Sequence, residues 1–299
     1  LSHPEIDYGI IGEAIESLPK FLQALENKKD FSTVEGLAWR KNGEIKINPP
    51  KNNLVDFDTY PFPARHLLPN EKYHSFVSQR KNFTVMLTSR GCPYKCKFCI
   101  IARLPYQERS AENVLAEIER CYYDYGVREI DIFDATFFIN KKRTLIICEE
   151  IRRRGIKIEW TCRSRADVLN EEVLKEASRA GCREINLGIE SAAPQVLEAI
   201  NKQIKVEQVK NAVKLCNKYG IRVLGFFMFG NPGETEESLK KTIKFMLSLN
   251  IDFVQICRTI AKPKTDLDDL LIKETGRDYW REFVLGKVGE ERLPAPWTG

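Results

Sequence analysis

Three closely spaced cysteines give this chain its clearest capacity for metal chemistry. Three residues separate Cys92 from Cys96, and two separate Cys96 from Cys99. Thiolates this close together on one loop can hold a single metal centre. Structural zinc normally takes four protein ligands, and no second cysteine pair or Cys/His pair stands at a spacing that would complete such a set. A four-iron cluster on three thiolates instead leaves one iron open to a substrate; the alternatives are a degraded zinc site or three thiols in a surface loop.

The composition favours an ordinary folded protein of a reducing compartment. The 299 residues are 43% hydrophobic and 30% charged, and no apolar run approaches the ~20 residues of a membrane span. Nine cysteines, an odd number, in a large chain without a secretory leader predict reduced thiols and a cytoplasmic location. The net charge of +5 is mild, so no clear nucleic-acid site is expected. Because the chain begins with Leu, we expect a fragment or a processed product.

The elements that must position these cysteines form a repeat. From residue 83 onward, a strand, a helix and a Gly or Asn follow one another several times, and Ser110, Asn170 and Thr235 are good N-cap residues. Such alternation predicts a parallel sheet, either an open doubly wound sheet or a partial (β/α) barrel. In both, functional groups collect at the carboxyl ends of the strands, which we expect at residues 84–89, 129–135, 157–162, 184–190, 222–230 and 253–260.

The first 80 residues follow a different pattern. Residues 14–25 have the apolar spacing of a helix, and Asn42-Gly43 predicts a hairpin turn. A Pro-rich stretch, residues 49–69, is predicted to be a linker that wraps the next domain. We therefore expect a small α/β segment with its linker in residues 1–80, the strand–helix repeat in 81–265, and the start of a C-terminal extension in 266–299.

The triplet resembles the cluster motif of the radical S-adenosylmethionine (SAM) superfamily, C-x-x-x-C-x-aromatic-C, with Cys92, Cys96, Phe98 and Cys99 in its places. The resemblance implies a partial (β/α)6 TIM-like barrel and a [4Fe-4S] cluster on the three cysteines, with Phe98 beside the cofactors. It implies that the amino and carboxylate groups of SAM chelate the open iron. One electron, from a reductant such as flavodoxin or ferredoxin, then cleaves SAM to methionine and a 5′-deoxyadenosyl radical. The radical would act on an unknown small-molecule or lipid-like substrate.

The resemblance also places SAM contacts at the ends of the second and third predicted strands. The family contacts the methionyl amine after the second strand, which makes Asp134 the first candidate and Thr136 the second, with a turn cap as the alternative for Asp134. After the third strand an arginine can grip the SAM carboxylate bidentately. Arg165 matches the usual position and Arg163 is one pleat away, with a surface salt bridge as the alternative.

Further candidates follow at later strand ends. Glu190 and Ser191 close a G-x-E-S sequence that resembles a family pattern, in which the acid accepts from the ribose or amine and the hydroxyl donates to the carboxylate. Met228 and Gly230 lie where the family packs adenine, with plain core packing as the alternative for Met228. Two further cysteines on strands could face the cavity as catalytic thiols, and these are Cys162 and Cys257.

The parts outside the barrel resemble cobalamin-binding radical SAM proteins, in residues 7–13, 34–40, 60–65 and 279–283. The D-x-H-x-x-G motif that this group places beside the cobalt of cobalamin is absent from the sequence. Cobalamin is therefore expected only in a longer parent protein. A small α/β cap on the barrel is the alternative for residues 1–80.

The sequence therefore predicts a radical SAM enzyme, with cobalamin-dependent methyl transfer as one outcome. Two alternatives stay open. One is a non-catalytic iron–sulfur or zinc protein in electron transfer or scaffolding, and the other is an enzyme like the tRNA methylthiotransferases, which share the barrel and the cluster loop.

Overall fold

The computed structural model describes residues 1, 3–27, 30–50, 56–74, 78 and 80–289. Contacts within the chain divide it into two units, Leu1–Val55 and Asp56–Gly299. Of the helices in the described ranges, none is both long and apolar enough to cross a membrane.

The first unit packs one helix on a small antiparallel sheet. Its strands lie in the order β1 (Tyr8–Ile10), β2 (Leu37–Lys41) and β3 (Glu44–Ile47), and its helix is α1 (Ala14–Glu26). Asn42 and Gly43 have φ angles of 51° and 81°, and positive φ at both positions is what a type I′ turn requires. The predicted hairpin is confirmed. The small core of this unit consists of Phe21, Ala24, Val34, Leu37 and Trp39.

The second unit is built on a six-stranded parallel sheet. Each of its strands lies beside the next one in chain order, from β4 at one edge to β11 at the other. A doubly wound sheet would reverse its order at a switch point, so this sequential order confirms the partial (β/α)6 barrel. The strands are β4 (Phe83–Met86), β7 (Glu129–Ile132), β8 (Glu159–Ser164), β9 (Cys182–Glu190), β10 (Arg222–Phe229) and β11 (Phe253–Arg258).

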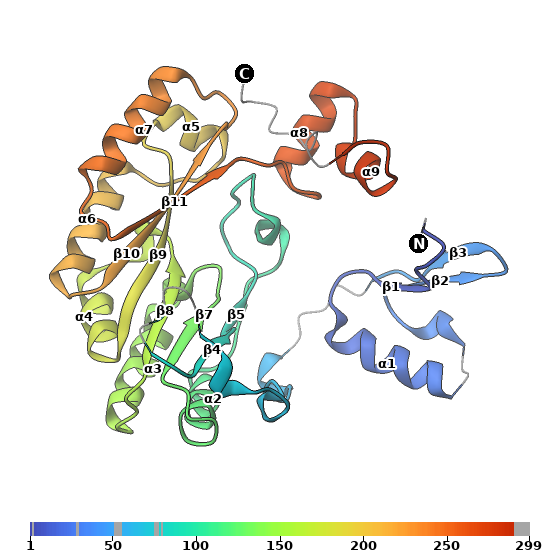
Figure 1. The fold of residues 1–299 in the computed structure, drawn as a ribbon, viewed down its shortest axis with the longest axis horizontal. Helices are drawn as coiled ribbons and strands as arrows, with labels where there is room; N and C mark the ends of the chain where they lie inside the picture. Colours follow the sequence, from blue (N-terminus) through green and yellow to red (C-terminus); the bar gives the residue numbers. More distant parts are fainter. Residues whose placement is uncertain (2, 28–29, 51–55, 75–77, 79, 290–299) are drawn as a thin grey trace. The chain divides into compact units, whose positions relative to one another are not determined.

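Helices cover one face of this sheet, as Figure 1 shows. Ser110, Asn170 and Thr235 each accept a backbone N–H three residues later, which confirms the three predicted N-caps. The main core lies between the sheet and these helices. The helices are α2 (Ala111–Tyr123), α3 (Lys141–Arg153), α4 (Glu171–Arg179), α5 (Pro194–Ala199), α6 (Val206–Lys218) and α7 (Glu236–Ser248), followed after β11 by α8 (Asp266–Thr275) and α9 (Tyr279–Val284).

The first strand of the barrel is shorter than predicted. β4 ends at Met86, and the chain then forms β5 (Ser89–Arg90), which pairs antiparallel with β6 (Gln107–Glu108). The backbone N–H groups of Thr88 and Ser89 donate to the carboxylate of Asp134. These bonds turn the chain out of the sheet and set the direction in which the cysteine loop leaves it.

Residues 56–74 include part of the stretch that we expected to be linker, residues 49–69. They belong to the barrel unit and contain three short 3-10 helices. Arg65 is buried there and donates to Glu117 Oε1 of α2 at 2.5 Å and to the Val85 carbonyl of β4 at 2.9 Å. The segment is therefore anchored by a buried charge.

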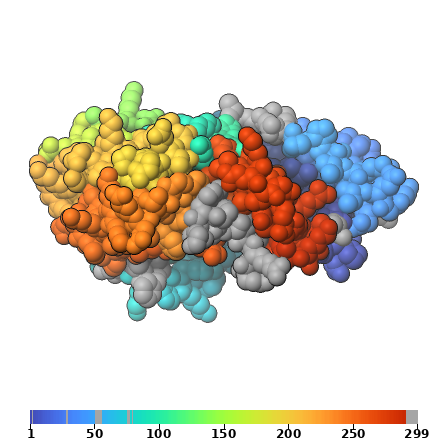
Figure 2. Space-filling view, turned by 90° about the horizontal axis from the view of Figure 1, so that it is seen from above, coloured from blue at the N-terminus to red at the C-terminus, as the bar shows by residue number. Residues whose placement is uncertain are grey.

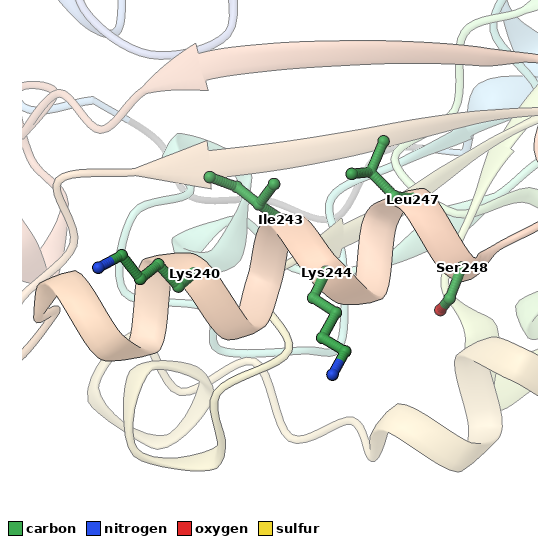
Figure 3. Close-up of a pocket in the computed structure, with 5 residues that line it drawn as sticks. All are labelled: Lys240, Ile243, Lys244, Leu247 and Ser248. Carbon is green, nitrogen blue, oxygen red and sulfur yellow. The ribbon is translucent and has the colours of Figure 1, made fainter.

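One pocket lies on the helical side of the barrel, on α7. Figure 3 shows Ile243 and Leu247 on one side of that helix and Lys244 and Ser248 on the other. Leu247 is 76% exposed. Because this pocket lies along a helix and the cysteine loop lies at the strand ends, we assign no part of the metal chemistry to it.

Candidate cluster and cofactor site

The cysteine triplet lies on a loop beyond the carboxyl end of β4, between β5 and β6. Cys92 and Cys96 are buried, Cys99 is partly exposed, and none of them forms a disulfide. Gly91 opens the loop with a φ of 72°, and a Cβ at this residue would lie 2.1 Å from the carbonyl oxygen of Pro105. Only glycine fits here, so the base of the loop closes tightly.

Neighbouring segments hold this loop in place. The Lys97 N–H donates to the Ile200 carbonyl at 2.9 Å, and Asn201 Nδ2 donates to the Lys95 carbonyl at 2.7 Å. From another side, the Leu267 N–H at the start of α8 donates to the Lys97 carbonyl at 3.1 Å. Figures 1 and 2 show α8, in red, beside the teal cysteine loop.

Phe98, the aromatic residue of the motif, packs against α8. It is half-buried and touches the small cluster of Ala261, Leu267 and Leu271. The Nζ atom of Lys202 lies 5.8 Å from its ring centroid. Phe98 therefore fixes the loop to α8, and its contact with a cofactor stays a prediction.

Burial and nearby positive charges act in opposite directions on the cysteine thiols. Burial raises the pKa of Cys92 and of Cys96 in the metal-free protein. The positive charges of Lys202 and Arg165 lower the pKa of Cys96. A backbone hydrogen bond at Tyr94, then the charge of Arg165 and a hydrogen bond at Thr136, lower the pKa of Cys92. Cationic side chains beside cysteines stabilise the thiolate form that binds metal.

These donors fit a four-iron cluster. A single ion needs its ligands to converge on one point, and among the described residues no three His, Cys, Asp or Glu side chains do so. In a four-iron cubane each thiolate binds a different iron atom. The three sulfur atoms therefore stand apart around the cluster and do not converge on one point. Three unpaired thiols on one closed loop, beside two cationic groups, suit that arrangement.

Asp134 caps a turn. Its fully buried carboxylate accepts the N–H of Thr88 at 2.6 Å, the N–H of Ser89 at 3.0 Å, and the Thr88 hydroxyl. These bonds are those of the capping alternative, and the contact of Asp134 with the SAM amine stays a prediction. Thr136, the second candidate, lies against Cys92.

Arg165 lies behind the cysteine loop with its guanidinium already occupied. Its Nε and Nη2 donate to Asp167 at 2.9 and 3.1 Å, and Nη2 also donates to the Lys202 carbonyl at 2.7 Å. Its Nη1 lies 3.6 Å from the sulfur of Cys96. A bidentate grip on a carboxylate needs two parallel free N–H groups. Asp167 and the Lys202 carbonyl occupy that pair of donors here, and the grip of Arg165 on the SAM carboxylate stays a prediction.

Arg163 lies on the face of the sheet opposite the helices. It pairs with Asp131 at 2.8 Å, and its Cζ lies 3.5 Å from the ring centroid of Phe133. The neighbouring Asn186 has a buried Oδ1 without a hydrogen-bond partner among the described residues. Arg163, Asp131 and Asn186 thus form a polar patch inside the barrel, in which the Oδ1 of Asn186 has no donor among the described residues.

Glu190 and Lys202 form a buried ion pair at the end of β9. Their Oε1 and Nζ atoms lie 2.8 Å apart, and the side chains are 7% and 6% exposed. Glu190 has a φ of 66°, a conformation that costs a non-glycine residue about 1–3 kcal/mol and concentrates at functional sites. A Cβ on Gly188 would lie 2.7 Å from the Lys202 Nζ. The absence of a side chain at Gly188 therefore makes room for the pair.

Ser191 joins two elements of the fold. Its hydroxyl lies 2.9 Å from the Thr242 hydroxyl of α7, and it accepts the Ala193 N–H at 3.1 Å. It is also 1% exposed. The bond from Ser191 to the SAM carboxylate stays a prediction.

The remaining candidates divide between the two faces of the sheet. Met228 pairs in register with Cys257, and both are partly exposed on the face opposite the helices. Gly230 has a φ of 76° and donates its N–H to Glu234. The adenine contacts of Met228 and Gly230 stay predictions. Cys162 is fully buried in the core on the helix side, where burial raises its pKa well above the ordinary value. The expectation that Cys162 faces the cavity is wrong.

No pattern in the sequence pointed to Lys202. It lies in a short connection after α5, with no ligand spacing around it, and it is one of 47 Lys and Arg residues. Only its burial beside Glu190 and its charge near Cys96 distinguish it.

Comparisons with known proteins identify the family of this chain. The family model described as the radical SAM superfamily matches residues 86–246. The chain is 38% identical over 264 residues to the uncharacterized methyltransferase PH0819 of Pyrococcus horikoshii, covering 87% of this chain and 56% of that protein. It is 29% identical over 272 residues to the anaerobic magnesium-protoporphyrin IX monomethyl ester cyclase of Rubrivivax gelatinosus, covering 88% and 49%. The chain therefore spans about half the length of these relatives.

A solved structure shares the fold. The radical SAM methyltransferase TsrM of Kitasatospora setae, with cobalamin and a [4Fe-4S] cluster bound, superposes with a TM-score of 0.73 at 20% identity, covering 90% of this chain and 54% of that one. The family match extends over more than half of the chain and includes the cysteine loop. This chain belongs to the radical SAM superfamily.

Proposed function

We propose that this chain is the SAM-cleaving part of a radical SAM methyltransferase. The observation that carries the proposal is the set of three unpaired thiols, Cys92, Cys96 and Cys99, on a closed loop at the carboxyl end of the barrel. Membership of the superfamily supports the cluster and SAM as its cofactors. When bound, the cluster supplies one electron for the reductive cleavage of SAM, and a one-electron reductant such as flavodoxin or ferredoxin restores it.

The side chains at the end of β9 would bind SAM. The ammonium group of Lys202 would pair with the carboxylate of SAM, and the carboxylate of Glu190 would accept hydrogen bonds from its ribose or amine. Both groups are buried, where ionic contacts are stronger than in water. Gly188 leaves room beside the backbone for these two side chains.

Methyl transfer with cobalamin is proposed for the complete protein. PH0819 is named a methyltransferase, and the TsrM structure holds cobalamin. The sequence of this chain lacks the D-x-H-x-x-G motif, so any cobalamin would be bound by parts of a longer parent. The substrate would enter the face that carries Arg163 and Asn186.

Anaerobic reconstitution tests this function. The chain is loaded with iron and sulfide, reduced with dithionite and supplied with SAM. We expect release of 5′-deoxyadenosine from the wild type and none from Cys96→Ala. Cluster-loaded wild-type protein that binds SAM without ever cleaving it would exclude catalysis and leave an iron–sulfur scaffold. Tracing of a labelled methyl group with added cobalamin then separates methyl transfer from other radical chemistry.

A further inference from the structure

The contacts of Arg165 point toward the cluster loop and not toward the barrel cavity. Asp167 holds the guanidinium by two bonds, at Nε and Nη2, and the ring of Tyr94 lies 3.7 Å below its Cζ. The Lys202 carbonyl takes a further Nη2 proton. With Nε and Nη2 held by these partners, Nη1 is the remaining nitrogen of the guanidinium. It lies 3.6 Å from the sulfur of Cys96. That separation is a hydrogen-bond length for the large sulfur atom.

This contact changes the energy of the cluster that Cys96 would bind. The side chain of Arg165 is 5% exposed, so water screens its charge weakly. Adding an electron makes the cluster and its thiolates more negative. Hydrogen bonds and positive charge at a cluster sulfur stabilise that reduced form and set its reduction potential.

We propose that Arg165 is a positioning residue of the cluster, which raises the potential of the [4Fe-4S] couple through its N–H bond to Cys96, with Asp167 limiting the effect. The inference rests on the proposed function. In the couple concerned, one electron enters from an external reductant, the cluster passes from the 2+ to the 1+ state, and no bond forms or breaks. Arg165 thereby makes reduction of the cluster more favourable, and the reduced cluster supplies the electron that cleaves SAM.

Arg163 is a matched control two residues away. It too forms a two-point ion pair with an aspartate, at 2.8 and 3.2 Å from Asp131, and it too lies over an aromatic ring, that of Phe133. No hydrogen bond joins it to a cysteine among the described residues. Arg163→Gln removes the same charge and the same kind of pair as Arg165→Gln, and it leaves the Cys96 contact intact.

The experiment is a redox titration monitored by electron paramagnetic resonance on the SAM-free, reconstituted chain. We expect the midpoint potential of Arg165→Gln to be lower than that of the wild type by clearly more than the shift in Arg163→Gln. Arg165→Lys keeps the charge and loses the fixed fork, so its potential is expected between those of the wild type and Arg165→Gln. Equal shifts in the two glutamine variants would overturn the inference and leave the proposed function standing.

A second variant covers the case in which Arg165→Gln takes up no cluster. Asp167→Asn keeps Arg165 in place and removes the carboxylate that offsets its charge. Its potential is expected to rise above that of the wild type, and an unchanged or lower potential overturns the inference. A wild-type chain that takes up no four-iron cluster would overturn the proposed function as well.

Binding of SAM separates this role from a grip of Arg165 on the SAM carboxylate. Equilibrium dialysis with labelled SAM should give Arg165→Gln a Kd close to that of the wild type. A large loss of SAM affinity with an unchanged potential would mean that Arg165 grips the ligand, which contradicts the inference.

Discussion

Glu190 and Lys202 are two buried charges that neutralise each other, and this determines how they could receive SAM. Removing one partner of a buried pair leaves an uncompensated charge, which costs about 3–5 kcal/mol. SAM carries a carboxylate that can pair with Lys202, and an amino group and a ribose that can donate to Glu190, so neither side chain would be left unpaired. A ligand with only an acceptor or only a donor could not do so. The pair therefore favours a ligand that carries both.

Substitution of Gly188 tests this at the residue scale. In Gly188→Ala the new methyl group would lie 2.7 Å from Lys202 Nζ and 2.9 Å from Glu190 Oε1. Both atoms end flexible side chains, so the pair can move aside and the free energy of unfolding should fall by less than about 1 kcal/mol. SAM affinity should fall about tenfold or more, equivalent to about 1.4 kcal/mol, as measured by equilibrium dialysis on the cluster-loaded chain.

The control for this substitution is Gly9→Ala. Nothing lies within 4 Å of a Cβ at Gly9, so SAM affinity should not change. Equal affinities in Gly188→Ala and the wild type would show that the pair does not contact SAM.

At the scale of elements, local patterns predicted most of the fold and only part of the site. Helix caps, the Asn42-Gly43 turn and the cysteine spacing depend on neighbours in sequence, which a single sequence displays. The contacts of Arg165 do not depend on neighbours in sequence, because Lys202 lies 37 residues and Cys96 lies 69 residues away from it.

The same reason explains why the sequence did not reveal the hydrogen-bond partners of Asp134 and Ser191. Both were placed correctly at strand ends, but each found its partners on another element, Asp134 on the turn after β4 and Ser191 on α7. Which polar group at a strand end stays free for a ligand is decided by tertiary packing, and residue type alone cannot show it.

The anchoring of residues 56–74 gives a prediction at this scale. Arg65 and Arg109 both pair with Glu117, whose side chain is 2% exposed. In Arg65→Met the free energy of unfolding should fall by about 3–5 kcal/mol, because part of a buried charge network is lost. Urea unfolding of the cluster-free chain measures this loss.

An exposed arginine provides the comparison. Arg103 pairs with Asp266 and Asp269, but its side chain is 43% exposed. Arg103→Met should therefore cost less than about 1 kcal/mol. Equal losses in the two variants would mean that Arg65 does not anchor the segment.

Across the whole molecule, burial divides the nine cysteines into distinct groups. Five of them, Cys121, Cys148, Cys162, Cys182 and Cys216, are buried outside the loop, while Cys99 and Cys257 are partly exposed. Burial raises the pKa of Cys121 to about 11 and that of Cys216 to about 12. Only thiolate reacts with alkylating reagents, so these two thiols should be nearly inert in the folded chain at neutral pH.

Alkylation can therefore report the cluster site directly. With iodoacetamide at pH 8, Cys99 and Cys257 of the cluster-free chain should be modified first, as mapped by peptide mass spectrometry. Modification of Cys121 should rise only as the pH approaches 11, because its thiolate fraction grows toward the raised pKa. Reconstitution should protect Cys99 and leave Cys257 reactive, which makes Cys257 an internal control. If Cys99 reacts equally fast with and without the cluster, it is not a ligand, and the three-thiolate site with its open iron does not exist.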